Sequence, residues 1–218
     1  MAYYQQYRAP RGAGGVDDAL KALILANVVV FGAQMLIGSQ WLIRWFALWP
    51  AGTPPFEVWQ LVSYSFLHGG FIHLLFNMYA LWLFGTSIAQ VWGRDRFLIY
   101  YFVCVVGAAL VQLIVQNQAL QQGIVIPTIG ASGGVFGILL AFGMMFPNQT
   151  IVLLIPPIPV KAKWFVIGYG ALELYLGVSG PQSGVAHFAH LGGMAFGFVL
   201  IQYWRGRLPV KPKRIMFW

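Results

Sequence analysis

Six long apolar stretches, each with few or no charged residues, limit this chain to a protein that crosses a membrane several times. A helix needs about 20 consecutive apolar residues to span the hydrocarbon core of a bilayer. The composition agrees: 59% of the 218 residues are hydrophobic and 8% are charged, too few charges to cover a soluble domain. We therefore expect an all-α polytopic membrane protein built as a six-transmembrane-helix bundle. The six predicted helices lie at roughly residues 19–39, 70–91, 97–116, 132–147, 162–178 and 186–204.

The basic residues predict which face of the membrane each connection occupies. Of 13 Lys and Arg residues, 12 lie near the N-terminus, between the second and third stretches, between the fourth and fifth, or after the sixth, and only Arg44 lies on the other face. Lys and Arg collect on the cytoplasmic side, so both termini are expected to be cytoplasmic. This topology explains the net charge of +8, and we expect a lipid bilayer rather than nucleic acid as the surroundings. The expected location is the cell (inner) membrane of a prokaryote.

These stretches divide the chain into a membrane domain at 19–204, a disordered cytoplasmic tail at 1–18 and a basic cytoplasmic tail at 205–218. The outer segment at 40–69 is expected to be partly embedded in the membrane. Its tryptophans at 41, 45 and 49 predict a short helix in the membrane interface, and a simple aromatic belt is the alternative. The connection at 147–163 contains three prolines, so we expect no helix there.

One serine stands among glycines where the fourth stretch begins, in the sequence Gly130-Ala131-Ser132-Gly133-Gly134. A serine hydroxyl is a weak nucleophile unless a neighbouring base takes its proton. At ~1.5 Å per residue this stretch covers about 24 Å, less than the ~30 Å of hydrocarbon. We therefore expect Ser132 to lie inside the membrane near its outer side, within reach of water.

The candidate base is His190, at the start of the sixth stretch. Gly193 and Gly197 follow three and seven residues later and share its helical face, while Gly133 and Gly137 lie beside Ser132 on the fourth stretch. Two glycine-faced helices would bring the hydroxyl and the imidazole within ~3 Å. The alternative is that these glycines only pack helices together.

The second stretch carries a further polar pair, His73 and Asn77, spaced four residues apart. Both side chains can donate to an oxyanion formed by serine attack, and the alternative is a polar contact between helices. Only two acidic residues, Glu57 and Glu173, lie toward the outer side, and neither is on a helix that carries the serine or the histidine. A Ser–His dyad without a carboxylate is therefore the simplest prediction.

Together these motifs resemble the rhomboid family of intramembrane serine proteases over residues 19–204. The resemblance rests on Gly130-Ala131-Ser132-Gly133, on His190-Leu191-Gly192-Gly193 with Gly197, and on His68 followed by His73 and Asn77. It implies a serine endopeptidase that cuts in or near transmembrane segments of membrane proteins, without metal or cofactor. The nucleophile would be Ser132, the general base His190, and the oxyanion donors His73, Asn77 and the backbone N–H of Ser132. The family also implies a water-filled cavity open to the outer face and lateral substrate entry near the second and fifth helices.

Three positions depart from the family pattern. Gln60 follows Trp59 where members commonly have arginine, and Gln90 stands where a glutamate is common. Phe136 replaces a tyrosine; it can stack on His190 but cannot donate a hydrogen bond. His187 and Glu173 have no assigned role.

Two other functions compete with proteolysis. A rhomboid-like pseudoprotease would bind transmembrane helices without cutting them, but Ser132 and His190 are both retained. A transporter or channel would be expected to carry polar residues across the whole bilayer, whereas the strongly polar set here stops at the outer half. The sequence does not indicate the substrate, the source organism, the oligomeric state or the gating mechanism.

Overall fold

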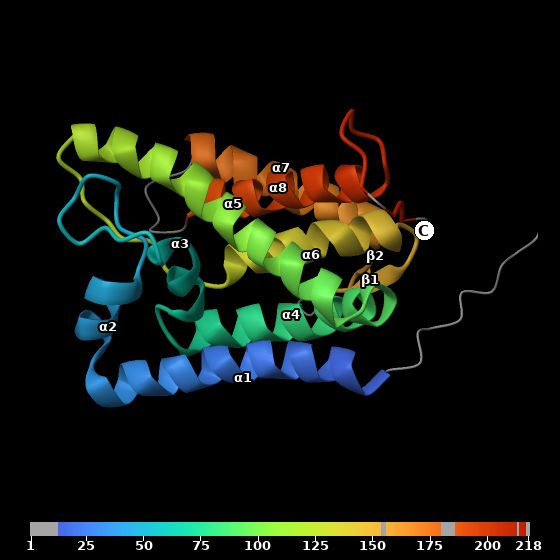
Figure 1. The fold of residues 1–218 in the computed structure, drawn as a ribbon, viewed down its shortest axis with the longest axis horizontal. Helices are drawn as coiled ribbons and strands as arrows, with labels where there is room; N and C mark the ends of the chain where they lie inside the picture. Colours follow the sequence, from blue (N-terminus) through green and yellow to red (C-terminus); the bar gives the residue numbers. More distant parts are fainter. Residues whose placement is uncertain (1–12, 154–155, 180–185, 213, 217–218) are drawn as a thin grey trace, which may run out of the picture.

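The computed structural model describes residues 13–153, 156–179, 186–212 and 214–216, which are mostly helical. The long helices run back and forth between two ends of the molecule (Figure 1). A helix is found at each of the six predicted places. The elements in chain order are α1 (Ala13–Ile37), α2 (Ser39–Phe46), α3 (Gln60–Ser63), the 3-10 helix η1 (Tyr64–Phe66), α4 (Phe71–Trp92), α5 (Arg94–Gln121), α6 (Ser132–Met145), β1 (Thr150–Val152), β2 (Pro159–Lys161), α7 (Ala162–Ser179) and α8 (His187–Trp204).

The chain is a multi-span membrane protein. Within the described residues, three helices are long and apolar enough to cross a bilayer, namely Asp18–Ile37 of α1, α4 and α5. The shorter helix α6 is apolar as well. The count of six membrane passes stays a prediction, since α6 has only 14 residues and α7 and α8, with 18 residues each, are less apolar than the three long helices.

The two ends of the molecule differ in structure (Figure 1). One end, which we call the outer end, carries α2, α3, η1 and the loop that leads into α6. The opposite end, the hairpin end, carries β1, β2, the start of α1 and the residues that follow α8. The first and last described segments therefore lie at the same end, the arrangement that an even number of passes requires.

Several boundaries differ from the predicted ones. Helix α1 begins at Ala13, inside the predicted tail, and residues 1–12 of that tail lie outside the described residues. In the predicted C-terminal tail, Met216 is buried and its N–H donates to the carbonyl of Trp204 at 2.8 Å. The tail therefore folds back on the end of α8.

The connections follow the predictions in part. The predicted interface helix is present as α2, with Trp41 and Trp45 exposed, but Trp49 lies beyond its end and donates its indole N–H to the carbonyls of Ile43 and Arg44. The connection at 147–163 has no helix before Ala162, as predicted, but it forms an antiparallel pair of strands that was not predicted.

A single glycine, Gly93, joins α4 to α5 with φ +77°, a conformation that other residues rarely adopt.

Helix α6 lies at the centre of the bundle, packed against α4, α5, α7 and α8. A Cβ added to Gly193 would overlap the carbonyl oxygen of Gly133, and one added to Gly133 would overlap Ala108 of α5. Lipid tails are as apolar as leucine, so helices in a bilayer associate through such close packing of small residues. The glycines predicted to face one another thus place the backbones of α6 and α8 in direct contact.

We predict that Gly193→Ala destabilises the protein, because its methyl group overlaps the backbone of α6. Overpacking of this kind costs about 1–3 kcal/mol. Thermal unfolding in detergent, followed by circular dichroism, should show a lower Tm. Gly32→Ala is the matched control, since nothing lies within 4 Å of a Cβ added there on α1. Equal Tm values for the two variants would contradict this account of the α6–α8 contact.

Candidate active site

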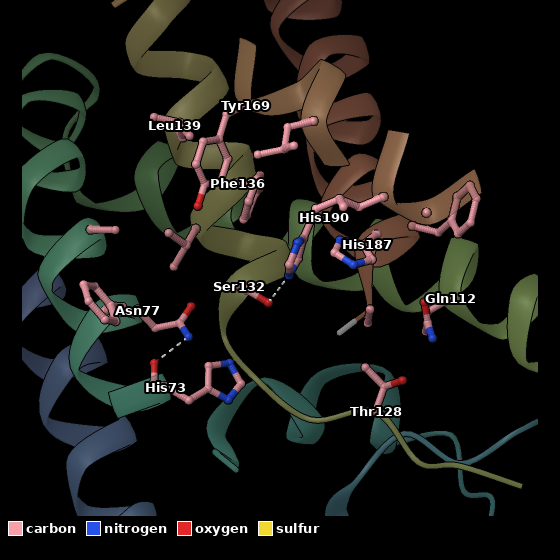
Figure 2. Close-up of a pocket in the computed structure, with 18 of the residues that line it drawn as sticks. His73, Asn77, Gln112, Thr128, Ser132, Phe136, Leu139, Tyr169, His187 and His190 are labelled. Carbon is pink, nitrogen blue, oxygen red and sulfur yellow. Dashed lines mark hydrogen bonds between the residues drawn. The ribbon is translucent and has the colours of Figure 1, made fainter. Parts of the chain in front are cut away.

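Ser132 and His190 form a direct contact between α6 and α8. The serine is the first residue of α6, and the histidine lies in the first turn of α8. Serine Oγ lies 2.7 Å from histidine Nε2, so the hydroxyl can donate its proton to that nitrogen (Figure 2). The pair therefore has the separation that nucleophile and base require.

The imidazole of His190 is also held across its face. The ring of Phe136 stacks on it, with centroids 4.2 Å apart and planes within 5° of parallel. The stacking predicted for Phe136 is confirmed. This contact fixes the plane of the imidazole beneath the serine hydroxyl.

A carboxylate lies beside the pair, contrary to the prediction. Oxygen Oε2 of Glu173, on α7, is 2.8 Å from Nδ1 of His190 and 2.7 Å from Nδ1 of His187. All three side chains are largely buried. The expectation that no acidic group accompanies the serine and histidine is wrong, because α7 turns this residue toward α8. His187, without a role from sequence, is the second partner of the same oxygen.

His73 and Asn77 lie on α4, across the cavity from Ser132 (Figure 2). Asn77 donates one side-chain N–H to the carbonyl of His73 at 2.9 Å, and its amide has a second N–H to offer. The loop before α6 passes directly over the His73 ring. There Gly130 has φ +129°, and a Cβ at this position would lie 2.8 Å from the ring. Only glycine allows this approach.

His68 lies just before α4, buried and edge-on to His73, with ring centroids 5.1 Å apart. Its backbone is fixed by Gln34 of α1, which accepts from the N–H of His68 at 2.9 Å and donates to its carbonyl at 3.1 Å. Burial, aided by the neighbouring His73, lowers the pKa of His68 to about 4. The imidazole is therefore neutral at physiological pH and packs against the ring of His73.

Two further glutamines hold the irregular backbone at the outer end. Gln116 of α5 donates to the carbonyls of Leu48 and Ile126 and to the hydroxyl of Thr128, at 2.9–3.1 Å. It thereby ties the outer segment to the loop that carries Ser132. Gln60, at the position where arginine was expected, donates to the carbonyls of Trp45 and Pro55 and accepts from the N–H of Trp49. A neutral amide makes the structural contacts at that position. Gln90 is exposed on α4.

A cavity of about 1450 Å³ is lined by Ser132 and His190 and, from α4, by His73 and Asn77. Its histidine, serine, asparagine, glutamine and threonine side chains gather where α4, α6 and α8 begin (Figure 2). Toward the hairpin end the lining becomes apolar, with Leu83, Phe84, Leu139 and Phe165. One wall is formed by α4 and the facing wall by α7. The cavity thus joins a polar chamber to an apolar groove between these two helices.

The remaining predicted site residues are the packing glycines. Gly133 and Gly193 meet at the α6–α8 contact, Gly137 lies against Cys104, and Gly197 against the Tyr100 hydroxyl. Their positions keep the helices that carry Ser132 and His190 close together.

Residues 55–207 match the Rhomboid domain family. The chain is 32% identical over 176 residues to Rhomboid protein 1, mitochondrial, of Saccharomyces cerevisiae, covering 81% of this chain and 50% of that protein. It is 32% identical over 209 residues to Presenilin-associated rhomboid-like protein A, mitochondrial, of Danio rerio, covering 93% of this chain and 52% of that protein. The chain belongs to the rhomboid family, and it spans about half the length of these two relatives.

We predict that Gln116→Leu loosens the loop that carries Ser132, because the contacts of the Gln116 amide with three acceptors are lost and only the Leu48 carbonyl keeps a backbone donor, the N–H of Thr128. Backbone amides near residues 48 and 128 should exchange with deuterium at least about fivefold faster, since one net hydrogen bond is worth about 1 kcal/mol. Gln118→Leu, at an exposed position on the same helix, is the control. If mass spectrometry finds the same exchange in both variants, Gln116 does not anchor this loop.

Proposed function

We propose that this protein is an intramembrane serine endopeptidase that hydrolyses peptide bonds in or near transmembrane segments of membrane proteins. The observation that carries the proposal is the 2.7 Å contact between Ser132 Oγ and His190 Nε2 beside a cavity walled by two helices. Membership of the rhomboid family supports the same reaction class. Ser132 is the proposed nucleophile and His190 the general base.

The reaction proceeds in two halves. In the first, Ser132 Oγ attacks the scissile carbonyl carbon while His190 Nε2 takes the hydroxyl proton. The tetrahedral intermediate collapses by breaking its C–N bond, and the histidine gives that proton to the leaving amine. In the second half, the histidine takes a proton from water, and the oxygen of that water attacks the acyl-enzyme ester. The resulting tetrahedral intermediate breaks its C–Oγ bond, the histidine returns the proton to serine Oγ, and the new carboxyl terminus leaves.

The negative charge that develops on the carbonyl oxygen needs donors. Ser132 begins α6, and the first N–H groups of a helix have no partner within it, so they point toward an incoming oxyanion. The side chains of His73 and Asn77 face the same space from α4. We assign the Ser132 N–H and these two side chains to the oxyanion hole.

The shape of the cavity suggests how a substrate helix would lie. Its polar chamber would receive the unwound segment with the scissile bond, because an extended backbone needs water or protein donors inside a membrane. Its apolar groove between α4 and α7 would hold the helical remainder. Lateral entry between these helices fits this arrangement.

The names of the two relatives can be compared with the membrane predicted from the sequence. The yeast and zebrafish proteins are named as mitochondrial, so they give no support to a prokaryotic inner membrane. We therefore propose only that the chain crosses its membrane six times and how it is oriented there. The hairpin end carries most of the basic residues, so it faces the side of the membrane on which Lys and Arg collect.

The proposed function predicts cleavage of a transmembrane reporter by the purified protein in liposomes. Ser132→Ala and His190→Ala should each abolish cleavage, because one removes the nucleophile and the other its base. Ser179→Ala, at the exposed end of α7, is the matched control and should cleave like wild type. Product formation on denaturing gels measures the result, and persistent cleavage by Ser132→Ala would falsify the nucleophile assignment. A protein that binds the reporter without cutting it would be the pseudoprotease.

We also predict that Asn77→Ala lowers kcat more than it changes KM, since an oxyanion donor acts mainly on the transition state. The expected loss is about 10²-fold, corresponding to up to ~3 kcal/mol for one donor. Initial rates over a range of reporter concentrations separate the two constants. An unchanged kcat would remove Asn77 from the oxyanion hole.

A further inference from the structure

The carboxylate of Glu173 completes a chain of contacts that runs through three helices. Serine Oγ on α6 meets Nε2 of His190 on α8, and Nδ1 of the same ring meets Oε2 of Glu173 on α7, at 2.7 and 2.8 Å. The carboxylate and imidazole side chains are only 8% and 9% exposed. Each ring nitrogen of His190 therefore has one defined partner.

We propose that Glu173 is the third member of a Ser132–His190–Glu173 triad, in which it acts as a positioning residue. An ionised carboxylate only accepts hydrogen bonds, so Nδ1 of His190 carries the proton and Nε2 keeps the lone pair that receives the serine proton. The same negative charge stabilises the imidazolium formed during attack. This proposal rests on the proposed proteolytic function and deepens it.

His187 supports the carboxylate from the other side. Its Nδ1 lies 2.7 Å from the same oxygen that His190 contacts, so both rings donate to Oε2. A carboxylate oxygen has two lone pairs, and two N–H donors satisfy both. His187 thus fixes the position of Oε2, and its ring meets that of His190 at 86°.

The same three side chains are also of the types that bind metal ions. Two ligands bound about 2.0–2.1 Å from a tetrahedral zinc ion lie about 3.3 Å apart. The separations here, 2.7 and 2.8 Å, are those of N–H···O hydrogen bonds. The geometry therefore favours a shared proton-accepting oxygen over a shared metal ion, and chelation tests this directly.

The kinetic test separates charge from shape with two substitutions. Glu173→Gln keeps the shape and removes the charge, whereas Glu173→Asp keeps the charge on a shorter side chain. We expect Glu173→Gln to lower kcat 10- to 100-fold with KM within twofold of wild type, and Glu173→Asp to retain the higher kcat of the two. Glu57→Gln, the same chemical change on the loop before α3, is the control and should match wild type. EDTA should leave wild-type cleavage unchanged.

Three outcomes overturn the triad while proteolysis itself stands. These are a Glu173→Gln enzyme with wild-type kcat, a Glu173→Asp enzyme slower than Glu173→Gln, and loss of wild-type activity in EDTA that zinc restores. The first means that the carboxylate plays no part in the reaction, the second that only its shape matters, and the third that it binds a metal.

A spectroscopic measurement tests the triad independently of cleavage. In protein labelled with ¹⁵N-histidine, an imidazole N–H held by a carboxylate gives a strongly downfield proton resonance. We expect this resonance from His190 in wild type and in Ser132→Ala, its loss in Glu173→Gln, and its survival in His187→Phe, which removes the second donor to Oε2. If wild type fails to cleave any reporter, the proposed function fails, and this spectrum still decides whether Glu173 holds the His190 proton. Its absence from wild type overturns the proposal.

Discussion

The backbone contact between α6 and α8 is the constraint on which the site depends. Gly193 lies so close to the carbonyl of Gly133 that any side chain there would push the helices apart. Hydrogen bonds weaken once donor and acceptor separate beyond about 3.2 Å, and the serine–histidine distance is 2.7 Å. A shift of well under 1 Å would therefore break the hydrogen bond between Ser132 and His190. The glycines therefore pack the two helices together and also set the distance between Ser132 Oγ and His190 Nε2.

A second constraint is that backbone polar groups inside a bilayer must find partners within the protein. The outer segment and the loop before α6 are irregular, so their carbonyls are not satisfied by helices. Gln34, Gln60 and Gln116 supply the missing partners from the sides. Amides suit this task because they donate and accept without bringing a charge into the interior. The positions of the loops around the candidate active site thus depend on these three glutamines.

Much of this arrangement was predictable from local sequence signals. Apolar runs and basic clusters predicted the long helices and their alternation, and Ser132, His73 and His190 were expected together because each lies near the outer end of its helix. The contact between Glu173 and His190 was not predicted, because the residues that Glu173 touches depend on how α7 is rotated about its own axis. Apolar residues around it, such as Leu172 and Leu174, are exposed, so no apolar stripe indicates which face is buried. Strands β1 and β2 have three residues each, too few for a periodic pattern.

The buried carboxylate explains in turn how a helix with no distinct apolar face is oriented. Of the described residues of α7, only Ala162, Val166 and Glu173 are buried, and two of these are small or medium apolar groups. An ionisable side chain at membrane depth costs several kcal/mol unless it is paired, so it favours the one rotation that gives it partners. Those partners are His187 and His190 on α8. The contact between Glu173 and His190 therefore orients both the proposed base and α7. The position of the cavity wall that α7 forms and the protonated nitrogen of the imidazole depend on the same hydrogen bonds.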